Sequence, residues 1–102
     1  MIVEVLHIDE CPSWEKAAVR TREALDLLGL GAVQVKARVL RTAEEAAVTA
    51  FAGSPTITVD GTDAFPSDGR TADLACRVYL TDQGLAGMPT TDQIVEAIRI
   101  RV

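Results

Sequence analysis

The sequence predicts a single α/β domain, residues 1–102, whose elements follow the order β-α-β-α-β-β-α. Three observations favour this fold class: branched apolar stretches alternate with segments of helical periodicity, two Thr-initiated capping boxes mark helix starts, and 102 residues suit one modest core. Right-handed crossovers predict that the first two strands are parallel. We therefore expect a mixed four-stranded sheet flanked by helices.

The first three elements are indicated by apolar periodicity. Ile2–Ile8 is almost entirely apolar, which is typical of a strand buried on both faces. Apolar residues recur at helical spacing from Pro12 to Leu28, and Gly29 provides a natural helix stop. Alternation of valine and alanine with polar residues over Val33–Val39 predicts a strand with one solvated face.

The middle of the chain predicts a short helix and a strand. Thr42 and Glu45 form a capping box that opens an alanine-rich helix reaching about Phe51. Thr56–Val59 is β-branched and ends at Asp60-Gly61, a turn signal, and therefore reads as the third strand.

The last third of the chain completes the pattern. Polar Thr62–Leu74 is interpreted as an irregular insertion between the third and fourth strands, and Cys76–Leu80 as the fourth strand, antiparallel to the third. The glycines and proline of residues 84–89 indicate a loop. A second capping box, Thr90 with Gln93, begins the terminal helix.

Composition limits the classes of partner. The chain has 48% hydrophobic and 25% charged residues, a net charge of −5 and no basic cluster, so nucleic acid and anionic membranes are not expected partners. The amino-terminal residues MIVEVLHIDE lack a basic region and a cleavage pattern, so a cytoplasmic protein is expected. Two cysteines and one histidine do not make a tetrahedral zinc set, and neither a metal site nor a cofactor is predicted.

The stretch IDECPSWEKAA places a cysteine between the first strand and the first helix. We expect Cys11 at the helix N-cap and Pro12 at the first helical position, where a missing N–H costs nothing. Unpaired helix N–H groups favour a thiolate there, whereas the charges of Asp9 and Glu10 disfavour it. His7 is expected to be a hydrogen-bonded core residue.

Two motifs, Cys11–Trp14 (CPSW) and Gly53–Thr56 (GSPT), resemble the thioredoxin-like superfamily. The element order extends this resemblance over essentially the whole chain. It implies that Cys11 is the nucleophile and that Ser54–Pro55 is a cis peptide bond beside it, whose backbone binds a partner peptide or glutathione. The residues implied to contact a substrate are Pro12, Ser13, Trp14, Ser54, Pro55 and Thr56.

The sequence also departs from that pattern. Trp14 stands where a second cysteine closes a local disulfide, and Cys76 is the only other thiol that could resolve a mixed disulfide. The resemblance places the start of the fourth strand, and hence Cys76, at the end of the sheet opposite Cys11.

Several functions fit these residues. The leading hypothesis is monothiol exchange, in which Cys11 attacks a disulfide-bearing protein or captures a small thiol such as glutathione. The alternative is a non-enzymatic module that binds a soft metal such as mercury, or a protein partner; a two-thiolate metal site requires the cysteines to converge. Ala75–Tyr79 and Pro89–Asp92 also resemble the end of alkylmercury lyase, in which a cysteine takes part in carbon–mercury cleavage. The oligomeric state is left open.

Overall fold

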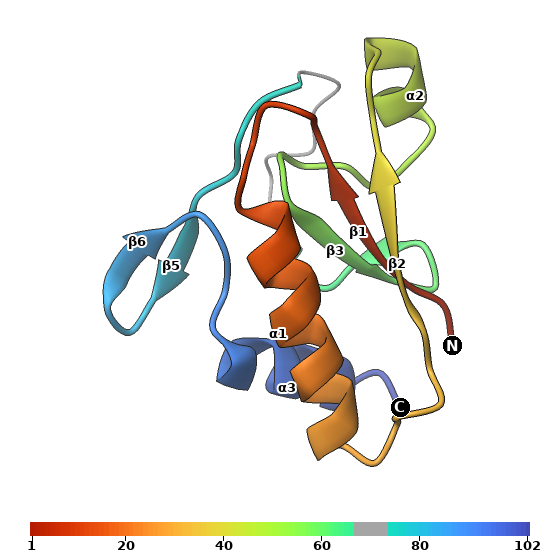
Figure 1. Ribbon diagram of the computed structural model, residues 1–102, viewed down its shortest axis with the longest axis vertical. Helices are drawn as coiled ribbons and strands as arrows, with labels where there is room; N and C mark the ends of the chain where they lie inside the picture. Colours follow the sequence, from red (N-terminus) through yellow and green to blue (C-terminus); the bar gives the residue numbers. More distant parts are fainter. Residues whose placement is uncertain (67–73) are drawn as a thin grey trace.

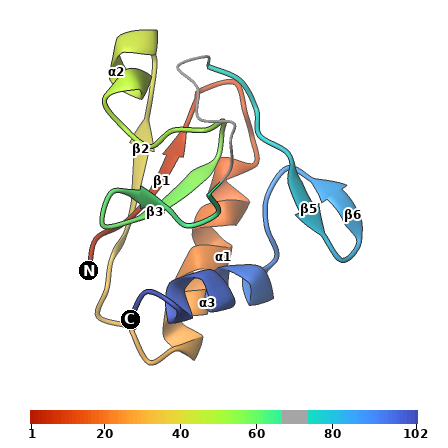
Figure 2. The same ribbon diagram turned by 180° about the vertical axis from the view of Figure 1, so that it is seen from behind.

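The described residues form a four-stranded mixed sheet, three helices and a separate two-stranded hairpin (Figure 1, Figure 2). The structure is a computed structural model and describes residues 1–66 and 74–102. Its elements are β1 (Val3–His7), α1 (Trp14–Leu27), β2 (Val35–Val39), α2 (Ala43–Ala47), β3 (Thr56–Val59), β4 (Thr62–Asp63), β5 (Tyr79–Thr81), β6 (Gly84–Ala86) and α3 (Thr91–Arg99).

The sheet has the strand order β2-β1-β3-β4, with β1 at its centre. β1 and β2 are parallel, as the crossover rule predicts, and Val5 lies opposite Ala37. β3 runs antiparallel to β1 and places Ile57 opposite Val5, and β4 runs antiparallel to β3. The carboxyl end of β1, from which the loop with Cys11 continues, therefore lies between β2 and β3.

One face of the sheet carries the main core, which α1 and α3 cover. The period-2 alternation of β1 and β3 directs four of their apolar side chains to this face, where α1 and α3 also pack against each other. Its fully buried aliphatic side chains are Val3, Val5, Leu25, Ile57, Ile94 and Ile98. Burying each such side chain contributes about 1.5–3 kcal/mol, so this face dominates the stability of the domain.

A smaller core lies on the opposite face, where β1 ends near α2. It consists of Leu6, Ile8, Cys11, Leu40, Ala46 and Phe51, all buried. Here α2 is only five residues long and ends at Ala47, so the prediction that this helix reaches Phe51 is wrong. Phe51 instead fills the small core from the loop that leads to β3.

The capping predictions differ in outcome. Thr90 Oγ1 accepts a hydrogen bond from Gln93 N, and the Gln93 side chain accepts one from Thr90 N, so the predicted capping box is confirmed. Thr42 Oγ1 accepts from Glu45 N, but the Glu45 carboxylate accepts from Arg41 N instead of Thr42 N. Thr42 is therefore an N-cap without the reciprocal bond.

Helix α1 begins later than predicted. Its N-cap is Ser13, and the first helical hydrogen bond runs from Ala17 N to Ser13 O at 3.1 Å. The prediction of Cys11 at the N-cap and Pro12 in the first turn is therefore wrong. The helix therefore begins two residues later than predicted, with Trp14 stacked on His7 at its start, and Cys11 stays in the loop.

The fourth strand also lies elsewhere than predicted. The Asp60-Gly61 turn has positive φ at both residues, 52° and 81°, and such a two-residue turn returns the chain directly into an antiparallel partner. That partner is β4, so an insertion between the third and fourth strands and a hairpin of residues 56–59 with 76–80 are both wrong. Of the predicted insertion, residues 67–73 lie outside the described part of the chain.

The predicted fourth-strand segment instead leads into the separate hairpin. Only Tyr79–Thr81 is a strand, and it pairs with β6, which the sequence indicated as loop. The hairpin extends from the body of the molecule in both views (Figure 1, Figure 2). No helix in residues 1–66 and 74–102 combines the length and apolar character needed to cross a membrane.

Candidate thiol site

Cys11 is held in the small core at the end of β1. Its side chain is only 3% exposed, and its Sγ donates a hydrogen bond to Ser54 O at 3.4 Å. The backbone N–H of Ile8 donates to Ser54 Oγ at 3.1 Å, which joins the loop before Cys11 to the loop before β3. Cys11 is therefore a fixed, largely covered thiol, in contrast to the exposed helix-start position that its sequence context predicted.

The loop before β3 contains a cis peptide bond between Ser54 and Pro55, as the sequence motif led us to expect. Thr56 closes this loop, because its Oγ1 donates to Gly53 O and accepts from Ala52 N. Gly53 has a φ of 112°, and an added Cβ would lie 2.7 Å from Arg77 Cβ. The glycine is thus required both by the backbone conformation and by the close approach of residue 77.

Cys76 lies directly opposite this loop. Ser54 and Cys76 form a parallel β-bridge, in which Ser54 N donates to Ala75 O and Arg77 N donates to Ser54 O, both at 2.8 Å. Cys11 donates from its Sγ to the carbonyl of the same Ser54, and its thiol raises the pKa of Cys76, so the two cysteines lie close together. The expectation that Cys76 lies at the opposite end of the sheet is therefore wrong, because β4 takes the fourth-strand position and frees residues 74–78 to return to Ser54.

The same bridge changes the expected role of the cis-proline loop. Both backbone hydrogen-bonding groups of Ser54 are occupied by Ala75 and Arg77 of the same chain. The carbonyl of Pro55 accepts a hydrogen bond from the Tyr79 hydroxyl. A partner chain cannot use these groups while the segment 75–79 is in place, so the expected partner contact at Ser54–Thr56 is filled internally.

The two thiols differ in exposure, and the pKa of Cys76 depends on Cys11. Cys76 is exposed, Cys11 is buried, and both are free. The pKa of Cys76 is raised above its usual value, first by the hydrogen bond with Cys11, then by burial, and then by the negative charges of Cys11 and Glu10. The raised pKa keeps the Cys76 thiol protonated at neutral pH.

Arg77 anchors the segment that carries Cys76. Its guanidinium pairs with Asp63 at 2.8 Å, and the two side chains are only 9% and 12% exposed. It also donates to Phe65 O and lies over the Tyr79 ring, 4.5 Å from the centroid. This arrangement ties the Cys76 segment to β4.

Tyr79 completes this anchor. Burial is the largest cause that raises the pKa of its hydroxyl, which therefore stays protonated and donates to Pro55 O. Its ring meets Phe65 edge to face. No sequence pattern indicates Asp63 as the partner of Arg77.

The other predicted contact residues lie around the helix entry. Trp14 stacks on His7 with ring centroids 4.1 Å apart and an interplanar angle of 9°, and it packs against the main core, whereas Cys11 belongs to the smaller one. Pro12 is exposed and Ser13 half-buried. An added Cβ at Gly87 would lie 2.8 Å from Ser13 Oγ, so Ser13 meets the loop after β6.

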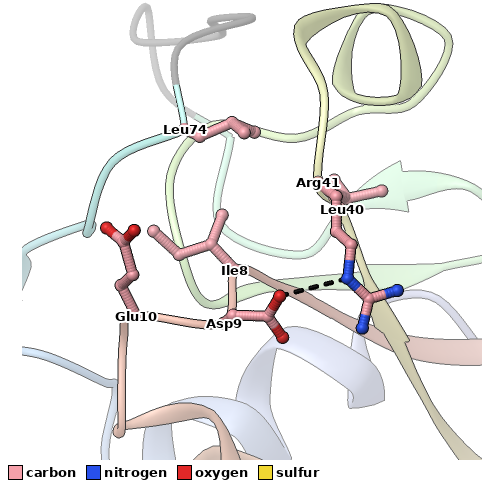
Figure 3. Close-up of a pocket in the computed structure, with 6 residues that line it drawn as sticks. All are labelled: Ile8, Asp9, Glu10, Leu40, Arg41 and Leu74. Atoms are coloured by element: carbon pink, nitrogen blue, oxygen red, sulfur yellow. Dashed lines mark hydrogen bonds and ion pairs between the residues drawn. The ribbon is translucent and has the colours of Figure 1, made fainter.

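A cavity lies beside the loop that precedes Cys11 and is walled in part by Ile8 and Leu40 of the small core (Figure 3). Its volume is about 180 Å³, and it is lined by Ile8, Asp9, Glu10, Leu40, Arg41 and Leu74. Asp9 pairs with Arg41 at 3.1 Å. Figure 3 shows the Glu10 carboxylate on the far side of the cavity from that ion pair, and within the described chain it has no hydrogen-bond or ion-pair partner.

Within the described ranges, no group of three or more histidine, cysteine or acidic residues could hold a metal ion. Comparisons with protein-family models, curated proteins and solved structures found no match for this chain. The candidate site therefore rests on its own geometry, which joins a covered thiol, an exposed thiol and an adjoining cavity.

Proposed function

We propose that the protein is a thiol–disulfide exchange protein on a thioredoxin-like fold, and that it works through the pair Cys11–Cys76. The single observation that carries this proposal is that both cysteines meet at Ser54: Cys11 Sγ donates to Ser54 O, and Cys76 forms a β-bridge with Ser54. The strand order, the strand directions and the cis Ser54–Pro55 bond also support the fold assignment. The proposal replaces a lone Cys11 with a pair.

The difference in exposure between the two thiols supports an order in which they react. Cys76 meets the external disulfide, because an attacking thiolate must reach the substrate sulfur and Cys11 is covered. Cys76 loses its proton, its sulfur bonds to one substrate sulfur, and the other half leaves as a thiolate that takes up a proton. Cys11 is then in position to resolve the mixed disulfide.

The second step follows the same chemistry. Deprotonated Cys11 attacks the sulfur of Cys76, the substrate half leaves as a thiol, and a Cys11–Cys76 disulfide forms. Two electrons and two protons pass to the substrate disulfide, which is reduced while the protein is oxidised. Two equivalents of an external small thiol reverse the oxidation and restore both cysteines.

Single-cysteine variants test this order. Reduced protein is mixed with a small disulfide at neutral pH, and adducts are followed by mass spectrometry. We expect Cys11→Ser to accumulate a mixed disulfide on Cys76, and Cys76→Ser to react much more slowly than the wild type. Equal reaction rates of Cys76→Ser and wild-type protein would overturn the assignment of Cys76 as the entry thiol.

Convergence of the thiols also favours a second candidate function, binding of a soft metal ion by two thiolates. Linear two-sulfur coordination suits such ions, and both cysteines meet at Ser54. Titration with mercury(II) tests this candidate through the ultraviolet absorption of metal–thiolate bonds. One ion per chain, lost in either single-cysteine variant, supports it; unchanged binding in those variants contradicts it.

A further inference from the structure

The cavity at the end of β1 is lined by residues that precede both cysteines in the chain. Ile8, Asp9 and Glu10 directly precede Cys11, and Leu74 comes two residues before Cys76. Ile8 and Leu40 also belong to the small core that contains Cys11. A group bound in this cavity would therefore lie close to the segments that carry both thiols.

The lining of this cavity combines an apolar wall with one charge, Glu10, that has no partner among the described residues. Ile8, Leu40 and Leu74 supply apolar side chains, and the Asp9 and Arg41 charges neutralise each other. Glu10 lies on the other side of the cavity and has no counter-ion in the described chain (Figure 3). The negative charge of Glu10 also raises the pKa of Cys76, the proposed entry thiol.

These features suit a short aliphatic stem that ends in a cation. A volume of about 180 Å³ is several times the roughly 30 Å³ that one water occupies in the liquid, so the cavity accommodates a short chain of heavy atoms. An alkylammonium group buries its methylene groups against apolar side chains and keeps its charge at a polar rim. An anionic group at the same place would meet the unpaired Glu10 carboxylate.

We propose that the pair acts preferentially on disulfides that carry a cationic aliphatic group beside the reacting sulfur, with Glu10 as the residue that selects the charge. This inference rests on the proposed exchange function and names its substrate class. In the mixed disulfide, the half retained on Cys76 places its ammonium group beside Glu10. The other half leaves as a thiol, with the proton balance already described.

Three small disulfides of similar length test the charge preference: cystamine, which is cationic, bis-hydroxyethyl disulfide, which is neutral, and dithiodipropionate, which is anionic. The rate of protein oxidation by each is divided by the rate at which the same disulfide oxidises free mercaptoethanol. At low ionic strength we expect cystamine to exceed dithiodipropionate by about tenfold, because the Glu10 carboxylate attracts an ammonium group and repels a carboxylate. In about 1 M salt the ratio should fall towards one.

Glu10→Gln is the decisive variant, with Glu23→Gln as the matched control. Glu10 and Glu23 are both exposed, and Glu23 lies well along α1, away from its first turn. We expect Glu10→Gln to lose most of the charge preference and Glu23→Gln to keep it. An undiminished preference in Glu10→Gln, or normalised rates that are equal for all three disulfides, overturns the inference but leaves the exchange function intact.

Failure of the exchange function has a different signature, because then none of the three disulfides oxidises the Cys11–Cys76 pair. Two peptide disulfides, with lysine or glutamate next to the cystine half, identify the source of the cation. A preference for the lysine peptide supports a polypeptide substrate. A preference seen only with cystamine supports a low-molecular-weight substrate with the same chemistry.

Discussion

Cys11 and Cys76 both meet Ser54, but the regions that carry them are held in different ways. Cys11 is fixed in an apolar cluster at the end of the central strand and is 3% exposed. Cys76 is exposed on a segment that joins the rest of the molecule through backbone bonds to Ser54 and through the Arg77–Asp63 ion pair. In the proposed exchange reaction, the accessible Cys76 meets the substrate and the covered Cys11 completes the reaction.

The largest expected effect comes from releasing the Cys76 segment. Arg77→Ala leaves the Asp63 carboxylate buried without its partner, so the free energy of unfolding should fall by about 3–5 kcal/mol. Urea denaturation measures this change. Formation of the Cys11–Cys76 disulfide should also become slower, because its segment has lost an anchor.

Arg99→Ala is the matched control for Arg77→Ala. Its ion pair with Glu96 is exposed and lies within α3, so its removal should leave the unfolding free energy essentially unchanged. Equal losses in the two variants would show that the Arg77 anchor is not special.

Oxidation should stabilise the protein, because a Cys11–Cys76 disulfide closes a loop that spans more than half of the chain. The entropy of closing such a loop predicts a gain of up to about 4 kcal/mol in unfolding free energy. Urea unfolding of the oxidised and reduced protein measures it, and Cys76→Ser treated with the same oxidant is the control. A less stable oxidised form would indicate that the two regions must separate to form the bond.

Gly53→Ala tests the close approach of the two regions. An alanine there adopts an unfavourable backbone conformation and forces its Cβ against Arg77, so a loss of about 2–4 kcal/mol is expected. Gly29→Ala has a positive φ but open space around it, and should cost only about 1 kcal/mol. Similar losses in thermal or urea unfolding would contradict the steric role of Arg77 at Gly53.

The smallest effect concerns the pH dependence of Cys76. The hydrogen bond with Cys11 is the largest cause that raises the pKa of Cys76, and a raised pKa lowers the thiolate fraction at neutral pH. Alkylation of Cys76 by iodoacetamide should therefore quicken as pH rises, up to and above pH 9. In Cys11→Ala the pKa should fall, so alkylation at neutral pH should be faster than in the wild type.

Glu10→Gln should give a smaller effect than Cys11→Ala in the same alkylation experiment. Glu10 is the last of the causes that raise the pKa of Cys76, so this variant should accelerate alkylation less than Cys11→Ala does. The raised pKa of Cys76 also affects stability. Protonated Cys76 stabilises the folded state, and this contribution is lost as pH rises through the folded-state pKa. Unchanged alkylation in Cys11→Ala would contradict the thiol contact.

Periodicity was sufficient to predict the central part of the fold. The alternation in β2, the apolar run of β1 and the capping box of α3 each correspond to an element of the structure. The two-residue strand β4 is too short to have a period of its own. The Asp60-Gly61 turn predicts a tight hairpin, and the strand that pairs with β3 there is β4, not residues 76–80.

The candidate site was less predictable than the core, because it depends on one long-range bridge. The CPSW and GSPT motifs identified Cys11 and Ser54–Pro55, whereas the Ser54–Cys76 bridge is a single pairing between irregular segments. Nor does a sequence pattern show that Arg77 reaches Asp63. The error in the fourth strand therefore also placed Cys76 at the wrong end of the sheet.

The most direct test of the central claim is peptide mapping of wild-type protein after brief reaction with cystamine at neutral pH. The proposed pair predicts a covalent link between the peptides that contain Cys11 and Cys76, with no cysteamine retained on the protein. A stable cysteamine adduct on either cysteine, without that link, would contradict it.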